Sequence, residues 1–98
     1  MSANSPTVTS HPQHKKIVVY TKDHCPYCVR AKRLLAARGY AFDEINLEGD
    51  DAKRKWLTDK TGQRTVPQIF IGELAIGGCD DLHELDRNGK LTELMRGE

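Results

Sequence analysis

The feature that most constrains this chain is a Cys-Pro-Tyr-Cys segment, residues 25–28, between a predicted buried strand and a predicted helix. The strand is predicted at residues 17–20, where β-branched and aromatic side chains form an apolar run bounded by charges. The helix is predicted at residues 26–38, because Pro26 suits the first helical position and Gly39 suits the position after a helix end. The segment therefore begins at the N-terminus of a helix that directly follows a strand.

The rest of the chain alternates in the same manner. The elements predicted after the first helix are a strand, a helix, two strands and two helices, at residues 41–47, 51–61, 68–71, 74–76, 79–87 and 91–95. In the helix at 51–61 we expect Trp56 to lie in the core. The early strand–helix–strand unit predicts parallel strands, and the short turn at 72–73 predicts an antiparallel hairpin. The order β-α-β-α-β-β-α thus predicts an α/β fold with a four-stranded mixed sheet flanked by helices.

Size and charge limit the class of protein. The 98 residues allow one core, which we place at residues 15–98. Residues 1–14 are rich in Ser, Thr, Pro, Asn and His, which predicts a disordered arm. No apolar run is long enough to span a bilayer, so we expect a soluble protein. The net charge of +1 argues against nucleic acid or an anionic membrane as a partner.

Three cysteines leave one unpaired, which does not suit a secreted disulfide framework. No secretory signal is apparent either, so we expect a reducing, cytoplasmic location. There a Cys-x-x-Cys pair is either catalytic or part of a metal site. A structural zinc site would need two more ligands, for which Cys79 and His83 are the candidates. The position between a strand and a helix favours redox chemistry.

The two cysteines of the segment differ in their predicted surroundings. As the N-cap residue, Cys25 can accept hydrogen bonds from the N–H groups of Tyr27 and Cys28, and the helix dipole favours negative charge there. Lys22 and protonated His24 would add positive charge, so a Cys25 thiolate is stabilised and should be the nucleophile. Cys28 lies one turn further on, within disulfide range and turned toward the core, and should resolve the intermediate.

Three separated segments then carry a family resemblance. They are Tyr-Thr-Lys-x-x-Cys-Pro-Tyr-Cys at 20–28, Thr-Val-Pro-Gln-Ile-Phe-Ile at 65–71 and Ile-Gly-Gly-Cys-Asp-Asp-Leu at 76–82. In this order they resemble the signature segments of dithiol glutaredoxins, bacterial ones especially, and the similarity covers residues 16–96. The resemblance implies a thioredoxin fold and a glutathione-dependent thiol–disulfide oxidoreductase. Glutathione would be the co-substrate, with no metal expected.

The resemblance also implies a cis peptide bond before Pro67, which would face Cys25, with the backbone of Val66 exposed to an extended ligand. From local sequence alone this dipeptide is an extended strand start, and the trans form is favoured.

The segment at residues 77–80 predicts a place for a small zwitterion. Flexible glycines before a helix N-terminus can receive a carboxylate, and Asp80 can receive an ammonium group. The γ-glutamyl end of glutathione has both groups, and the resemblance implies the same assignment. Its glycyl carboxylate would then meet Lys22 and Gln63. The implied glutathione-binding residues are Lys22, Tyr27, Gln63, Thr65, Val66, Pro67, Cys79 and Asp80.

The expected substrates are glutathionylated proteins and proteins with disulfides. We expect the protein to act as a monomer. Two alternatives remain open. One is a thioredoxin-type enzyme that a dedicated reductase regenerates. The other is an iron–sulfur cluster carrier with Cys25 and glutathione as ligands, although relatives of that kind have a Cys-Gly-Phe-Ser site without the stiffening Pro26.

Overall fold

The computed structural model describes residues 15–96, so the predicted arm at residues 1–14 lies outside the described residues. The elements are β1 (Ile17–Thr21), α1 (Pro26–Ala37), β2 (Asp43–Asn46), α2 (Asp51–Thr61), β3 (Gln68–Ile71), β4 (Leu74–Gly77), α3 (Cys79–Arg87) and α4 (Lys90–Arg96). None of the helices in residues 15–96 has the length and apolar character that crossing a membrane requires.

The four strands form one mixed sheet in the order β2-β1-β3-β4. Strand β1 pairs with β2 in parallel and with β3 in antiparallel fashion, and β3 and β4 form an antiparallel hairpin. The predicted mixed sheet with flanking helices is thus confirmed. Strand β2 is shorter than the predicted 41–47, because only residues 43–46 continue the parallel pairing.

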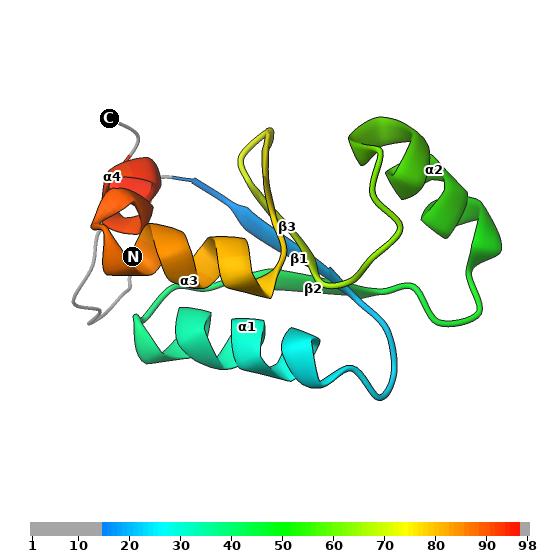
Figure 1. Ribbon diagram of the computed structural model, residues 1–98, viewed down its shortest axis with the longest axis horizontal. Coiled ribbons are helices and arrows are strands. Elements are labelled where there is room, and N and C mark those ends of the chain that lie inside the picture. Colours follow the sequence, from blue (N-terminus) through cyan, green and yellow to red (C-terminus); the bar gives the residue numbers. More distant parts are fainter. Residues whose placement is uncertain (1–14, 97–98) are drawn as a thin grey trace, which may run out of the picture.

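Two clusters of buried side chains hold the helices against the sheet. In Figure 1, α1 and α3 lie next to each other and α2 lies away from them. Because side chains alternate along a strand, Ile17 and Val19 of β1 face one side, where they join buried residues of α1, α3 and α4. Tyr20 faces the other side and meets Phe70 of β3 and Leu57 of α2. Helix α2 therefore lies apart from the other three helices.

The start and end of α1 follow the local signals in the sequence. Pro26 occupies the first turn, where its missing N–H costs no hydrogen bond. The helix ends before Gly39, whose φ of 80° lies in the left-handed region that glycine adopts without a steric penalty. Helix α1 thus runs from the Cys-x-x-Cys segment to the far end of the sheet.

The prediction that Trp56 lies in the core is wrong. Its side chain is 49% exposed, with its ring centroid 6.1 Å from that of Tyr20 and with Lys60 Nζ 5.8 Å from the ring centroid. Leu57 is the only buried residue of α2, so this helix rests on the sheet along a narrow line. Trp56 covers the rim of that contact and is not enclosed by it. Val29, an apolar residue of α1, is also exposed.

Candidate functional site

Cys25 occupies the N-cap position of α1, as predicted. Its backbone is extended (φ −116°, ψ 100°), and its Sγ accepts a hydrogen bond from the backbone N of Cys28 at 3.1 Å. The backbone N of Val29 donates to the Cys25 carbonyl at 3.2 Å and so closes the first turn. A sulfur at this position faces the unpaired N–H groups and the positive end of the helix dipole, which both stabilise a thiolate.

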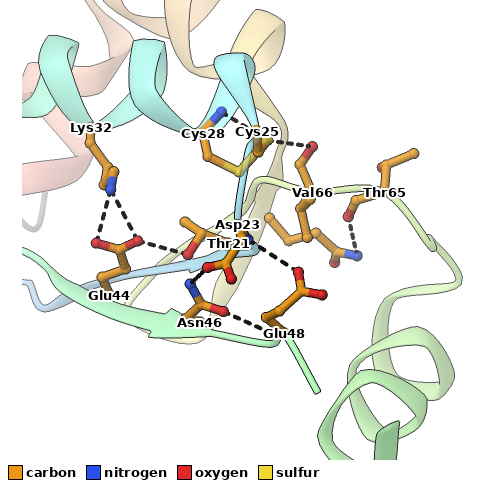
Figure 2. Close-up of a disulfide and its surroundings, with 11 residues drawn as sticks. Thr21, Asp23, Cys25, Cys28, Lys32, Glu44, Asn46, Glu48, Thr65 and Val66 are labelled. Carbon is orange, nitrogen blue, oxygen red and sulfur yellow. Dashed lines mark hydrogen bonds and ion pairs between the residues drawn. A yellow bond between two sulfur atoms is a disulfide. The ribbon is translucent and has the colours of Figure 1, made fainter. Parts of the chain in front are cut away.

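Cys25 and Cys28 form a disulfide with their Cα atoms 5.2 Å apart (Figure 2). The two residues differ in access to solvent: Cys25 is partly exposed, whereas Cys28 is 2% exposed. An attacking reagent from solution can therefore reach Cys25 first. After reduction, Cys28 would remain behind it, within disulfide range.

The segment before β3 approaches the Cys25 sulfur. The Val66–Pro67 peptide bond is cis, as the family resemblance implied, and the carbonyl oxygen of Val66 lies 3.9 Å from Cys25 Sγ. The side chain of Gln68 fixes the loop that precedes this peptide bond. Its Nε2 donates to the carbonyl oxygens of Gln63 and Thr65, each at 2.9 Å. Gln68 is only 6% exposed. Gln68 was not among the predicted site residues, although one amide in an otherwise apolar strand indicates a buried side chain that must be hydrogen-bonded.

A groove runs from this segment to the start of α3, and we call it the Tyr27 groove. It brings together seven of the eight residues predicted to bind glutathione: Tyr27, Gln63, Thr65, Val66, Pro67, Cys79 and Asp80. The charged side chains that line it are both acidic, those of Asp80 and Asp81. Tyr27 is 54% exposed, so its ring stands open to a ligand at the edge of the groove.

A second groove lies on the other side of Thr65 and Val66, and we call it the Lys22 groove. It contains Lys22, the eighth predicted residue, together with Cys25. Residues from α2 and the following loop complete it, among them Arg54 and Arg64. Thr65, Val66 and Gln68 line both grooves. The two grooves therefore meet beside the reactive sulfur.

The start of α3 is held by Asp81, which the sequence analysis did not single out. Asp81 Oδ2 accepts a hydrogen bond from the backbone N of Gly78 at 2.9 Å. Gly77 has a φ of 110°, and a Cβ at this position would collide with the Asp81 carboxylate. The glycines predicted to receive a ligand thus also admit this internal carboxylate. A carboxylate three residues after the cap is an ordinary helix-start signal.

A hydrogen-bonded pair of charges lies on the other side of the disulfide from Val66 (Figure 2). Lys32 Nζ contacts both carboxylate oxygens of Glu44 at 3.0 Å, and the buried hydroxyl of Thr21 donates to Glu44 Oε2 at 2.7 Å. The Thr21 hydrogen bond and, secondarily, Lys32 lower the pKa of the Glu44 carboxyl below its ordinary value. Lys32 and Glu44 line a shallow hollow together with Cys25 and Cys28, so the rear of the disulfide also faces charged groups.

Cys79 is a buried free thiol at the start of α3. Burial raises its pKa above the ordinary value, and nearby Arg30 only partly opposes that effect. The thiol therefore resists ionisation. Within residues 15–96 no three His, Cys, Asp or Glu side chains are grouped so that they could hold a metal ion. The zinc alternative required Cys79 and His83 to join Cys25 and Cys28, and the structure does not bring them together.

Comparison with known proteins identifies the relatives of this chain. Residues 17–76 match the glutaredoxin family model. A glutaredoxin of Pseudomonas aeruginosa is 53% identical over 79 residues, which cover 81% of this chain and 94% of that protein. Glutaredoxin 3 of Escherichia coli strain K12 is 49% identical over 80 residues, covering 82% of this chain and 96% of that protein.

Solved structures give the same result. The crystal structure of a buckwheat glutaredoxin–glutathione complex matches with a TM-score of 0.78 at 42% identity, covering 83% of this chain and 76% of that one. A solution structure of a Brucella melitensis glutaredoxin matches with a TM-score of 0.74 at 42% identity, covering 92% of this chain and 96% of that one. With the Cys-x-x-Cys pair at the start of α1, these matches show that the chain belongs to the glutaredoxin family, whose members are glutathione-dependent thiol oxidoreductases.

Proposed function

We propose that this chain reduces mixed disulfides between proteins and glutathione, and disulfides within proteins, with Cys25 as the nucleophile and Cys28 as the resolving thiol. The observation that carries the proposal is the asymmetry of the pair. Cys25 Sγ is partly exposed, caps α1 and lines the Lys22 groove, whereas Cys28 is buried behind it. An activated outer sulfur with a protected inner one is the arrangement that thiol–disulfide exchange requires.

The reaction follows from that asymmetry. The Cys25 thiolate attacks the glutathione sulfur of the mixed disulfide, and the protein leaves as a thiolate that takes a proton from solvent. The thiolate of a second glutathione then attacks the glutathione sulfur bound to Cys25, giving glutathione disulfide and the free Cys25 thiolate. In the dithiol route, the Cys28 thiolate attacks Cys25 Sγ instead. This releases the bound group and forms the Cys25–Cys28 disulfide, which two glutathione molecules reduce.

The Tyr27 groove is the proposed site of the γ-glutamyl half of glutathione. Its acidic lining suits the ammonium group, for which Asp80 is the partner we propose. The backbone at Gly78 and Cys79 would receive the neighbouring carboxylate at the start of α3. The backbone of Val66, beside the cis bond to Pro67, would pair with the peptide in the manner of an added strand.

The glycyl carboxylate of glutathione is proposed to reach the opposite side of the Thr65–Val66 segment. Lys22 lies there, and it has no side-chain partner among residues 15–96. Gln63 lines the other groove, so its contact with the same carboxylate would have to cross over Thr65. The structure therefore favours Lys22 over Gln63 as the main partner of this end.

We extend the proposal to partners and location. Glutathionylated proteins and disulfide-containing proteins are the proposed substrates of a monomeric enzyme in the cytoplasm. The unpaired thiol of Cys79 and the redox pair suit a compartment in which thiols are kept reduced.

A coupled assay tests the proposal. Glutathione, glutathione reductase and NADPH are mixed with the mixed disulfide of glutathione and 2-mercaptoethanol, and NADPH consumption is followed. The wild type should turn over this substrate, and Cys25→Ser should not, because a serine hydroxyl stays protonated at neutral pH. Circular dichroism checks that the variant is folded. Residual activity in folded Cys25→Ser would refute the assignment of the nucleophile.

A further inference from the structure

The resolving step of the dithiol route requires an ionised Cys28. Its sulfur can attack Cys25 Sγ only as a thiolate. Cys28 is 2% exposed, and removal of a thiol from water disfavours its charged form. At the moment of attack Cys25 is joined to glutathione in a disulfide and carries no charge. The fixed charges around Cys28 therefore decide how readily it ionises.

A lysine and a glutamate share a hollow with Cys28. Lys32 lies one helical turn after Cys28 in α1, so the two side chains are neighbours on one face of the helix. Helical side chains tilt toward the helix N-terminus, which directs Lys32 back toward Cys28. Lys32 Nζ contacts both carboxylate oxygens of Glu44 in β2, each at 3.0 Å. Figure 2 shows this pair on the side of the disulfide away from Val66.

Hydrogen bonds fix Glu44 in this position. Its Oε2 also accepts a hydrogen bond from the buried hydroxyl of Thr21 at 2.7 Å. The side chains of Lys32 and Glu44 are 31% and 34% exposed, so water screens their charges less than those of a fully exposed pair. The Thr21 hydrogen bond and, secondarily, Lys32 lower the pKa of the Glu44 carboxyl, which makes it a poor acceptor for a thiol proton. The pair therefore acts on Cys28 through its charges.

We propose that Lys32 and Glu44 act on Cys28 in opposite directions, and that their balance sets the fraction of turnovers that close the Cys25–Cys28 disulfide. The Lys32 ammonium group stabilises a Cys28 thiolate, and the Glu44 carboxylate destabilises it. In that step the Cys28 proton passes to solvent, the Cys28–Cys25 bond forms, and glutathione leaves Cys25 as a thiolate. This inference rests on the proposed function, because it concerns the resolving thiol of the same reaction.

The ionisation of Cys28 is measured in Cys25→Ser, where residue 25 is uncharged as it is in the mixed disulfide. Thiolate absorbance is followed against pH, and the curve of Cys25→Ser/Cys28→Ser is subtracted to remove the signals of Cys79 and the tyrosines. We expect Glu44→Gln to raise the acid dissociation constant of Cys28 about tenfold, and Lys32→Met to lower it about tenfold. With both substitutions together the constant should return to near its wild-type value. The other charged or titratable residues that line the hollow are the same in every variant: Lys22, Asp23 and His24.

The rate of disulfide closure gives a second measurement. Each reduced variant, with Cys25 and Cys28 intact, is mixed with excess glutathione disulfide and quenched with acid at intervals. Mass spectrometry then follows the decay of the glutathione adduct. While Cys28 is mostly protonated and the Brønsted coefficient is about 0.5, a tenfold change in the dissociation constant changes the closure rate about threefold. Glu44→Gln should therefore close about threefold faster than the wild type, and Lys32→Met about threefold slower.

Matched controls locate the effect at the pair. Asp43→Asn removes an exposed carboxylate beside Glu44 in β2, and the alternation of side chains directs it to the other face of the strand. Arg33→Met removes an exposed cation beside Lys32 in α1. Neither residue lines the hollow, and both variants should close at the wild-type rate. Lys32→Arg keeps the positive charge and should also keep that rate. Circular dichroism checks that each variant is folded.

The sign of the two shifts is the decisive result. If Lys32→Met and Glu44→Gln change the closure rate in the same direction, or leave it unchanged, the inference is overturned and the proposed function stands. Changes as large in Asp43→Asn or Arg33→Met would overturn it too, because the general field of the protein would then be responsible. If the wild-type glutathione adduct forms but never closes, Cys28 is not the resolving thiol. That result would refute this part of the proposed function, and the inference with it.

Discussion

Gln68 tests whether the loop beside Cys25 must be held in place for glutathione to bind. Its buried side-chain amide donates to the carbonyl oxygens of Gln63 and Thr65, each at 2.9 Å. Gln68→Leu keeps a side chain of similar size in β3 and removes both donors. The carbonyl groups of Gln63 and Thr65 then lose their hydrogen-bond donor. The segment that carries Thr65 and Val66 is no longer tied to β3 through the side chain of residue 68.

The cost follows from those two hydrogen bonds. A hydrogen bond of this kind contributes about 0.5–1.5 kcal/mol net, so the free energy of unfolding should fall by about 1–3 kcal/mol. For a domain of this size, 2 kcal/mol corresponds to a fall in Tm of roughly 10 °C. The loss of positioning should raise KM for a glutathionylated substrate about fivefold, while kcat stays within about twofold, because the sulfur of Cys25 is untouched.

Thermal unfolding and steady-state kinetics with the mixed disulfide of glutathione and 2-mercaptoethanol measure these effects. Ile17→Val is the matched control, because Ile17 is fully buried at the start of β1 and the substitution costs about 0.5–1.5 kcal/mol. It should lower Tm without raising KM. If Gln68→Leu lowers Tm and leaves KM at the wild-type value, or if Ile17→Val raises KM equally, Gln68 is not a positioning residue.

Three further predictions concern charge. Asp80→Asn should lower kcat/KM for glutathionylated substrates about tenfold, because a charge-assisted hydrogen bond to the ammonium group contributes about 1.5–3 kcal/mol. In the reduced protein at pH 6, Cys25 should react with iodoacetamide far faster than free cysteine does, whereas buried Cys79 should stay unmodified; mass spectrometry of peptides distinguishes the two. The hydrogen bond from Arg38 lowers the pKa of Asp86 in the folded state, so its stabilising effect is present above the unfolded pKa and is lost as pH falls through the folded one. The Tm difference between wild type and Arg38→Met should therefore shrink on going from pH 6 to about pH 2.

Unchanged kinetics in Asp80→Asn would remove the proposed γ-glutamyl site. Alkylation of Cys25 at the rate of free cysteine would remove the argument that the helix N-terminus activates it. A Tm difference for Arg38→Met that is the same at both pH values would show that the ion pair with Asp86 does not stabilise the fold.

The parts of the fold that depend on residues adjacent in the sequence were predictable from the sequence. Pro26 and Gly39 bracket α1 through local backbone chemistry, and the Cys25 N-cap follows from them. The failure at Trp56 has a physical cause: Leu57 is the only residue of α2 that is buried, and helical spacing cannot tell how wide the contact between α2 and the sheet is. Large aromatic side chains also remain partly exposed more often than aliphatic ones.

The sequence could name candidate site residues but could not predict the shape of the surface that they line. Lys22 and Asp80 were both assigned to glutathione, yet the structure places them in two grooves of opposite charge. Neither groove is visible in the sequence, because Arg54 and Arg64 approach Cys25 only through tertiary packing of α2 and its loop. The cis peptide bond before Pro67 was likewise predicted only from the family resemblance, because the local sequence favours the trans form.

The separation of roles between the two cysteines is tested most directly by Cys28→Ser. Its kcat/KM is measured on a glutathionylated protein and on a protein disulfide, with glutathione as the reductant. On the glutathionylated protein, the kcat/KM of the variant should be of the same order of magnitude as that of the wild type, or higher. A second glutathione resolves the Cys25–glutathione disulfide without the thiol of Cys28. It should lose reduction of the protein disulfide, which needs the attack of Cys28 on Cys25. A folded Cys28→Ser that fails on the glutathionylated protein would contradict the glutathione mechanism and would favour a thioredoxin-type enzyme.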